Sequence, residues 1–164
     1  MPIEIILPLS ISMGLVAYGL TAKWYVLPTL KSIPLTDALI FLILPHLFRY
    51  VGLAFLIPGV TDVPLDTWFS IPAAYGDLGA ALLAFLAIVT LRVKWRWAIP
   101  TTWAFNVFGL FDLLTAVSLG IRFTQNGTLG ATYFIPALIV PGLVVTHIMI
   151  FSLLRQNGTT LRNA

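Results

Sequence analysis

Charged side chains are scarce in this sequence. Asp, Glu, Lys and Arg make up 9 % of its 164 residues, whereas soluble domains contain about 25 %. Hydrophobic residues make up 59 %, so too few charges remain to cover a surface that faces water. This balance excludes an ordinary soluble domain and indicates a polytopic membrane protein, and the length suits one compact bundle over residues 1–164.

Cysteine is absent altogether. Its absence excludes disulfide bonds, thiolate metal sites, thiol redox chemistry and a cysteine nucleophile. The catalytic patterns HExxH, GxSxG and GxGxxG are missing too, so the sequence favours a function other than catalysis. No basic leader precedes the first apolar run, so we expect that run to be a membrane span and not a cleaved signal peptide.

Five long apolar stretches are present instead. A helix that crosses a bilayer needs about 20 mostly apolar residues, and each of the five stretches is long enough. The sequence therefore predicts an all-α integral membrane protein, built as a single bundle of five transmembrane helices. The expected spans cover about residues 3–22, 36–57, 71–91, 98–122 and 134–154.

The basic residues indicate the orientation of these helices. If the spans alternate in direction, seven basic residues fall on one side, and the other side has only Arg122, at a helix end. Basic loops stay in the cytoplasm, so we expect the N-terminus outside and the C-terminus in the cytoplasm, in a bacterial-type plasma (inner) membrane. The net charge of +3 then reflects orientation and not affinity for nucleic acid. The seven residues are Lys23, Lys31, Arg92, Lys94, Arg96, Arg155 and Arg162.

Ionisable residues interrupt the second apolar stretch at PHLFRY, residues 45–50. On an α-helix His46, Arg49, Tyr50 and Leu53 would form one stripe about 100° wide. A charged group in the middle of a membrane costs about 3 kcal/mol or more, and a partner of opposite charge lowers that cost. We therefore expect the stripe to face other helices and Arg49 to meet an acidic side chain.

Two aspartates in other spans are candidates for this partner. At a rise of about 1.5 Å per residue, Arg49 and Asp77 each lie about 20 Å from the inner edge of the membrane, and Asp112 lies about 21 Å from it. We predict an ion pair of Arg49 with Asp77 or with Asp112, and the other carboxylate would be protonated or shared through a water. An ion pair that only fixes helix register is the alternative interpretation.

A second polar layer is expected nearer the cytoplasm. It contains His46, Asn106 and His147, which come from three different spans. The expected depths of the two histidines differ by about 4–5 Å, which is within the error of the span boundaries. Neutral imidazoles bonded to backbone carbonyls are the structural alternative here. The candidate ligand-binding or proton-relay residues of both layers are Arg49, Asp77, Asp112, His46, Asn106, His147 and, further out, Tyr50.

These residues favour a protein that binds or transports a small anionic or proton-linked molecule. Arg49 would hold an anionic group, and Asp77, Asp112 or a histidine would carry the proton. Five spans without an internal repeat are few for an alternating-access carrier, so we also expect a homo-oligomer or a larger membrane complex. The expected partners are thus the lipid bilayer and a small-molecule ligand.

Two alternatives are compatible with the same residues. His46 and His147 would be the axial ligands of a b-type haem in an electron-transfer subunit, if a gap of haem size separates their rings. Otherwise His46, Tyr50, Asp77 and Asp112 would supply an acid and a base to a membrane-embedded lipid-modifying enzyme, or the chain would be an accessory subunit of a larger complex. Two histidines with distant carboxylates do not indicate a metal site without haem.

Overall fold

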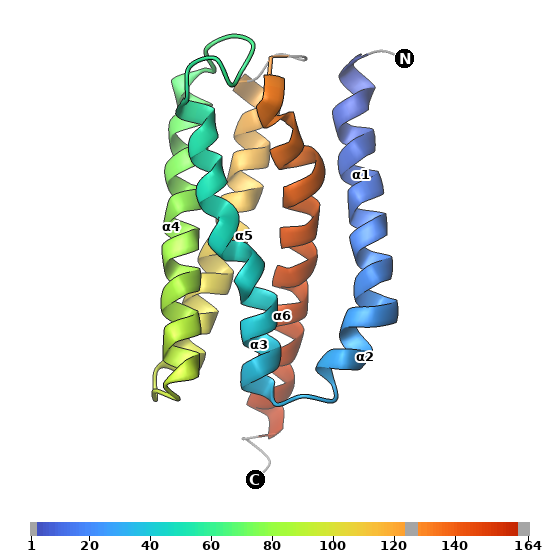
Figure 1. Cartoon of the computed structure of the whole chain (residues 1–164), viewed down its shortest axis with the longest axis vertical. Coiled ribbons are helices and arrows are strands. Elements are labelled where there is room, and N and C mark those ends of the chain that lie inside the picture. Colours follow the sequence, from blue (N-terminus) through green and yellow to red (C-terminus); the bar gives the residue numbers. More distant parts are fainter. Residues whose placement is uncertain (1–2, 124–127, 161–164) are drawn as a thin grey trace.

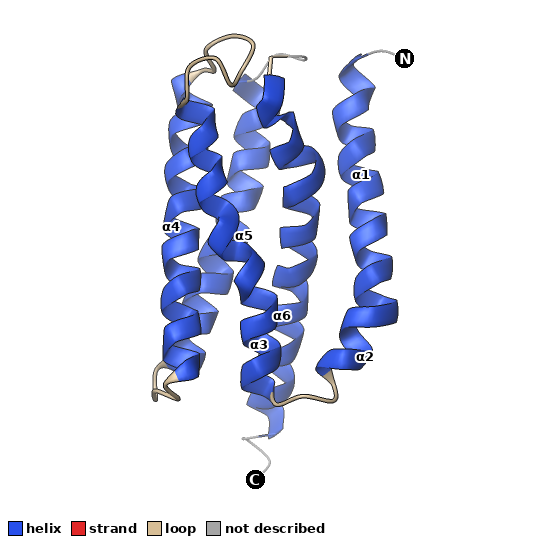
Figure 2. Cartoon of the chain, in the orientation of Figure 1, coloured by secondary structure: helices blue, strands red, loops and turns tan. Residues whose placement is uncertain are grey.

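The computed structural model describes residues 3–123 and 128–160, which form helices and loops and contain no strand (Figure 1; Figure 2). Five helices in this part of the chain are long and apolar enough to cross a membrane, which is the number that the sequence predicted. The elements in chain order are α1 (Ile3–Thr21), η1 (Ala22–Val26), α2 (Leu27–Leu30), α3 (Leu35–Ile43), η2 (Leu44–Leu56), α4 (Thr67–Arg92), α5 (Ala98–Phe123), η3 (Gly130–Tyr133), η4 (Ile135–Ile139) and α6 (Val140–Thr160).

The first long helix extends further than the sequence indicated. It continues beyond Thr21 through the π-helical segment η1 into α2, and it ends at Leu30 instead of residue 22. Lys23 does not end the helix, because it lies on an exposed surface where its long aliphatic stem is accommodated. The next helix begins after Pro34, whose φ of −56° and ψ of 145° place it outside the helical region.

The second long helix changes its type halfway along. After α3 the chain forms η2, a 3-10 helix of 13 residues that begins with Leu44 and Pro45. Since a 3-10 helix has about three residues per turn, every third side chain points the same way. The buried residues of η2 follow this period: they are His46, Arg49, Gly52 and Phe55.

This buried face differs from the stripe expected for an α-helix. Tyr50, which that stripe included, is 51 % exposed and points away from the bundle interior. Leu53 is only partly buried. The three-residue period replaces them on the inner face with Gly52 and Phe55.

Helix α4 packs closely against two of its neighbours. It lies against η2 on one side and α5 on the other, and most of its buried residues are alanines, which allow neighbouring backbones to approach closely. The helix α6 contacts α3 and α5, whereas α1 stands at the edge with α6 and η4 as its main neighbours (Figure 1). The buried polar residues come from η2, α4, α5, η3 and α6, and among the described side chains none lies on α1.

The chain alternates between the two ends of the bundle. The described start of α1 and the loop between η2 and α4 lie at one end, and α2, the turn between α4 and α5 and the end of α6 lie at the other (Figure 1). The basic residues of the first and third loops thus share one end with Arg155, while Arg162 lies outside the described residues. At the opposite end the backbone N–H of Asp62 donates to the carbonyl of Thr128 at 3.2 Å and joins the two remaining loops.

Candidate functional site in the helix bundle

Arg49 of η2 is held by groups on two other helices. Its Nε donates to Oδ1 of Asp77 on α4 at 2.8 Å, and its Nη2 donates to Oδ2 of Asp112 on α5 at 2.5 Å. Its Nη1 donates to the backbone carbonyl of Gly109 on α5 at 3.0 Å. The sequence predicted a pair with one of the two aspartates. The structure brings both carboxylates to the same guanidinium and engages all three of its nitrogens.

This ion cluster is buried. The side chain of Arg49 is fully enclosed, and the side chains of Asp77 and Asp112 are each 12 % exposed. Enclosed charges are costly unless partners of opposite sign and further hydrogen bonds surround them, as they do here. A cluster of one guanidinium and two ionised carboxylates carries one net negative charge. A single additional proton makes the cluster neutral.

Glycines make room for each carboxylate on the neighbouring helix. A Cβ added to Gly52 of η2 would overlap the carboxyl group of Asp77, and one added to Gly76 of α4 would overlap that of Asp112. On α5, a Cβ at Gly109 would come within 2.7 Å of Cε1 of His147 and within 3.1 Å of Nη1 of Arg49. The close approach of the three helices to the charged groups therefore depends on these glycines.

His147 of α6 is fixed by Asn106 of α5. The amide nitrogen of Asn106 donates to the backbone carbonyl of His147 at 3.2 Å, so its Oδ1 is oriented toward Nδ1 of His147 at 2.6 Å. An amide oxygen can only accept, so the hydrogen of the neutral imidazole is on Nδ1. The other nitrogen, Nε2, then carries a free lone pair.

His46 of η2 is fixed in the opposite tautomer by Thr146 of α6. The hydroxyl of Thr146 donates to the backbone carbonyl of Leu143 at 2.9 Å, so Oγ1 is left as an acceptor for Nε2 of His46 at 2.9 Å. With the Thr146 hydrogen on that carbonyl, the hydrogen of the neutral imidazole is on Nε2 and Nδ1 carries the lone pair.

The two imidazoles lie against each other, and each has a nitrogen without a partner. The ring centroids of His46 and His147 are 4.3 Å apart at an interplanar angle of 55°, and Phe105 packs against both rings. Both histidines are fully buried, and neither Nδ1 of His46 nor Nε2 of His147 has a hydrogen-bond partner among the described residues. The pair thus presents two buried lone pairs that no donor within residues 3–123 and 128–160 satisfies.

The pair does not fit a haem. Iron–imidazole bonds are about 2 Å long, so two axial rings on opposite faces of a porphyrin have centroids about 6 Å apart. The observed 4.3 Å leaves no space for the macrocycle between His46 and His147. Three or more His, Asp or Glu side chains do not converge as metal ligands anywhere in the described part of the chain.

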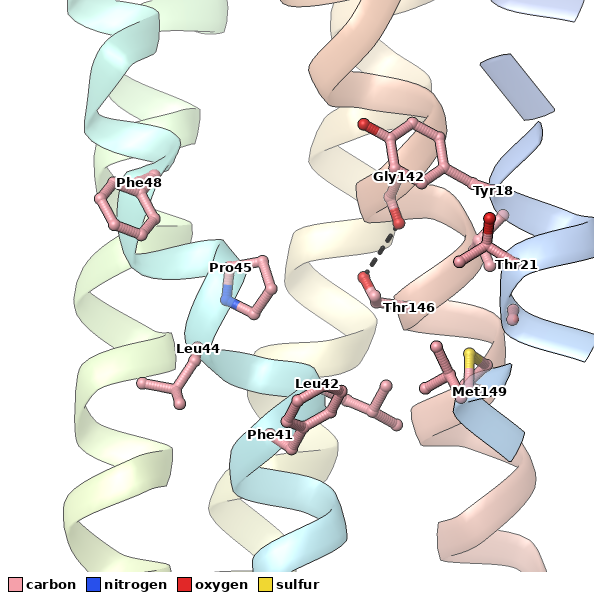
Figure 3. A pocket seen from close by; sticks show the side chains of 13 residues that line it. Tyr18, Thr21, Phe41, Leu42, Leu44, Pro45, Phe48, Gly142, Thr146 and Met149 are labelled. Carbon is pink, nitrogen blue, oxygen red and sulfur yellow. Dashed lines mark hydrogen bonds between the residues drawn. The ribbon is translucent and has the colours of Figure 1, made fainter. Parts of the chain in front are cut away.

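Two cavities adjoin the polar residues. The first lies beside Arg49, Gly52 and Asp77 and has a volume of about 10 Å³, which is room for one water and not for an organic anion. The second, of about 380 Å³, lies between α1 and the wall formed by α3, η2 and α6 (Figure 3). Thr146 lines this larger cavity and is also the hydrogen-bond partner of His46, so the cavity and the histidine pair share one residue.

The structure groups six of the seven candidate residues into two layers. The first layer contains Arg49, Asp77 and Asp112, and the second contains His46, Asn106 and His147, as the depth argument predicted. Tyr50 belongs to neither layer. Contributors that were not singled out from the sequence include Thr146, Gly52 and Phe105. The signal for Thr146 was its position next to His147, but an α-helical pattern does not show which neighbouring helix a threonine faces.

The fold and the site define a class of protein: an all-helical chain with five helices apolar enough to cross a membrane and an ion cluster buried between three of them. The chain belongs to a family described as a domain of unknown function, DUF8737, which matches residues 6–155. No curated protein and no solved structure matches the chain.

Proposed function

We propose that the chain is an integral protein of the plasma (inner) membrane, with its N-terminus outside and its C-terminus in the cytoplasm. The five apolar helices and the collection of basic residues at one end of the bundle support this placement. The absence of cysteine makes a direct test available. Thr61→Cys should react with a membrane-impermeant maleimide in intact cells, and Lys94→Cys should react only after lysis. The reverse pattern would refute the orientation.

We propose further that the buried cluster serves a proton-linked function, namely the binding or transport of a small molecule together with a proton. All three nitrogens of Arg49 are engaged by the protein, and the adjoining cavity admits only a water. The guanidinium therefore acts as the counter-ion of Asp77 and Asp112 and not as a binding site for an anionic ligand. The excess carboxylate then gives the cluster a place for one proton.

The histidine pair offers a second place for the same proton. Each neutral ring carries one lone pair that can take a hydrogen, and a second proton would put two cations side by side. A proton on the pair would also neutralise the excess negative charge beside Arg49. The observation that carries this proposal is the presence of two buried imidazole nitrogens without partners next to a charge cluster that lacks one positive charge. An ion pair that only fixed helix register would not require them.

Infrared spectroscopy tests where the proton resides. We expect a carbonyl band of a buried protonated carboxyl group in the unmodified protein near neutral pH, and its loss in the double variant Asp77→Asn, Asp112→Asn. Asp37→Asn is the matched control, because its side chain is 51 % exposed and lies 3.6 Å from the exposed Arg92. An unchanged band in the double variant would remove the carboxylates from the proposal.

Reconstitution in vesicles tests the transport of the proton. With a pH-sensitive dye inside and a membrane potential applied, we expect proton flux in the unmodified protein and in Asp37→Asn. The flux should fall to the level of protein-free vesicles in the double aspartate variant. Flux that is equal in all of these proteins would contradict a proton-carrying role for the cluster.

A further inference from the structure

The larger cavity has the features of a binding site. Its volume of about 380 Å³ falls in the range of small-molecule pockets, and it opens between α1 and the rest of the bundle (Figure 3). Most of its wall is hydrocarbon, including Leu44, Val145 and Met149. No charged side chain lines it. An ionised head group would therefore lose its hydration here without gaining a counter-ion.

The polar groups of this cavity are all uncharged. They include the hydroxyls of Tyr18, Thr21 and Thr146. Neither Tyr18 nor Thr21 makes a side-chain hydrogen bond to another described residue, although threonines on helices commonly bond to the carbonyl four residues earlier. In a hydrocarbon environment such hydroxyls cost free energy until a ligand or a water pairs with them.

The hydroxyl of Thr146 connects this cavity to the histidine pair. Tyr18 crosses from α1 over Gly142, where a Cβ would lie 3.0 Å from the ring carbon that bears the hydroxyl (Figure 3). Thr146 follows one turn later on α6 and accepts from His46. Pro45 on the opposite wall has no N–H, so it cannot donate to the carbonyls of the preceding turn. The cavity thus combines a hydrocarbon wall with a small group of neutral acceptors.

We propose that this cavity binds a single-chain amphiphile with an uncharged hydroxyl head, such as a long-chain or prenyl alcohol. The head donates to Thr146, whose second lone pair is available, and accepts from the hydroxyl of Tyr18. The chain lies along Leu44 and Met149 and leaves through the lateral opening into the bilayer. This inference rests on the membrane placement proposed above and does not depend on the proton-linked function.

Photolabelling in phosphatidylcholine nanodiscs tests the proposal with three probes of equal chain length: diazirine-bearing hexadecanol, hexadecane and palmitic acid. We expect the alcohol to label residues 41–48 and 142–149 saturably, and unlabelled hexadecanol to compete. The double variant Tyr18→Phe, Thr146→Val should reduce this labelling about tenfold, the effect of losing two hydrogen bonds. Thr115→Val is the matched control, because its hydroxyl bonds only within α5.

Each outcome decides the proposal. Equal labelling by the alkane would show ordinary contact with lipid, and preferred labelling by the acid would refute an uncharged head. Leu44→Trp should block the cavity while keeping both hydroxyls, and we expect it to fold because Leu44 is 44 % exposed. This variant therefore still tests the proposal if the double variant does not fold. Persistent labelling in Leu44→Trp would place the probe elsewhere and overturn the assignment. The infrared and flux experiments use no lipid probe, so a negative result there would count against the proton-linked function and not against this cavity.

Discussion

Replacing Arg49 by methionine isolates the energetics of the buried cluster. Methionine fills a similar volume, but it leaves Asp77 and Asp112 as two enclosed carboxyl groups without a counter-ion. Removing one partner from a buried ion pair costs about 3–5 kcal/mol, and Arg49 has two such partners as well as a hydrogen bond to Gly109. We expect Arg49→Met to lower the free energy of unfolding by at least about 3 kcal/mol.

The triple variant Arg49→Met, Asp77→Asn, Asp112→Asn is the decisive comparison. It removes every formal charge of the cluster, so no enclosed charge is left without a counter-ion, which is the main cost of breaking a buried ion pair. We expect it to recover most of the stability lost in Arg49→Met. The assay is unfolding by sodium dodecyl sulfate in mixed micelles, followed by circular dichroism. A single variant as stable as the unmodified protein, or a triple variant no more stable than the single one, would refute this account of the cluster.

The remaining predictions concern packing and tautomers. Gly52→Ala and Gly76→Ala should each destabilise the protein by about 1–3 kcal/mol, because the added methyl group would overlap a carboxyl group. Gly19→Ala is the control and should not destabilise it, because no atom lies within 4 Å of the added Cβ. The same unfolding assay compares the three variants. Tyr50→Phe should change stability by less than about 0.5 kcal/mol because the ring is exposed, and a larger loss would place the hydroxyl in the cluster. Asn106→Leu should cost about 1–3 kcal/mol. It should also release the fixed tautomer, which nitrogen NMR can follow because the chain has 2 histidines.

The number of helices and the position of the charged layer were predictable from the sequence. Apolar length alone gives five spans, since no other feature competes with it in a chain with 9 % charged residues. The meeting of Arg49 with Asp77 and Asp112 followed from depth, because α3, α4 and α5 share the α-helical rise and only the few residues from Leu44 to Arg49 have the rise of about 2 Å of a 3-10 helix. Depth does not reveal direction around a helix, so the choice between one and two aspartate partners was left open.

The contacts around the histidines were harder to predict. His46 and His147 were expected at one level, but their direct contact depends on how η2 and α6 are rotated, which a hydropathy pattern does not give. The hydrogen bond to Thr146 depends on the same rotation. Tyr50 was placed on the inner stripe because an α-helical period was assumed, and the 3-10 geometry of η2 turns it outward.

Because of its 3-10 geometry, η2 contributes side chains to both polar layers. In an α-helix each step of three residues turns the side chain by about 300°, so His46, Arg49 and Gly52 would diverge by about 60° per step. In η2 the step is close to a full turn, and the three residues face the same side. His46 then reaches His147, Arg49 reaches both aspartates, and Gly52 admits Asp77. Because long 3-10 helices are uncommon, the contacts to α4, α5 and α6 are the interactions that hold η2 in this form.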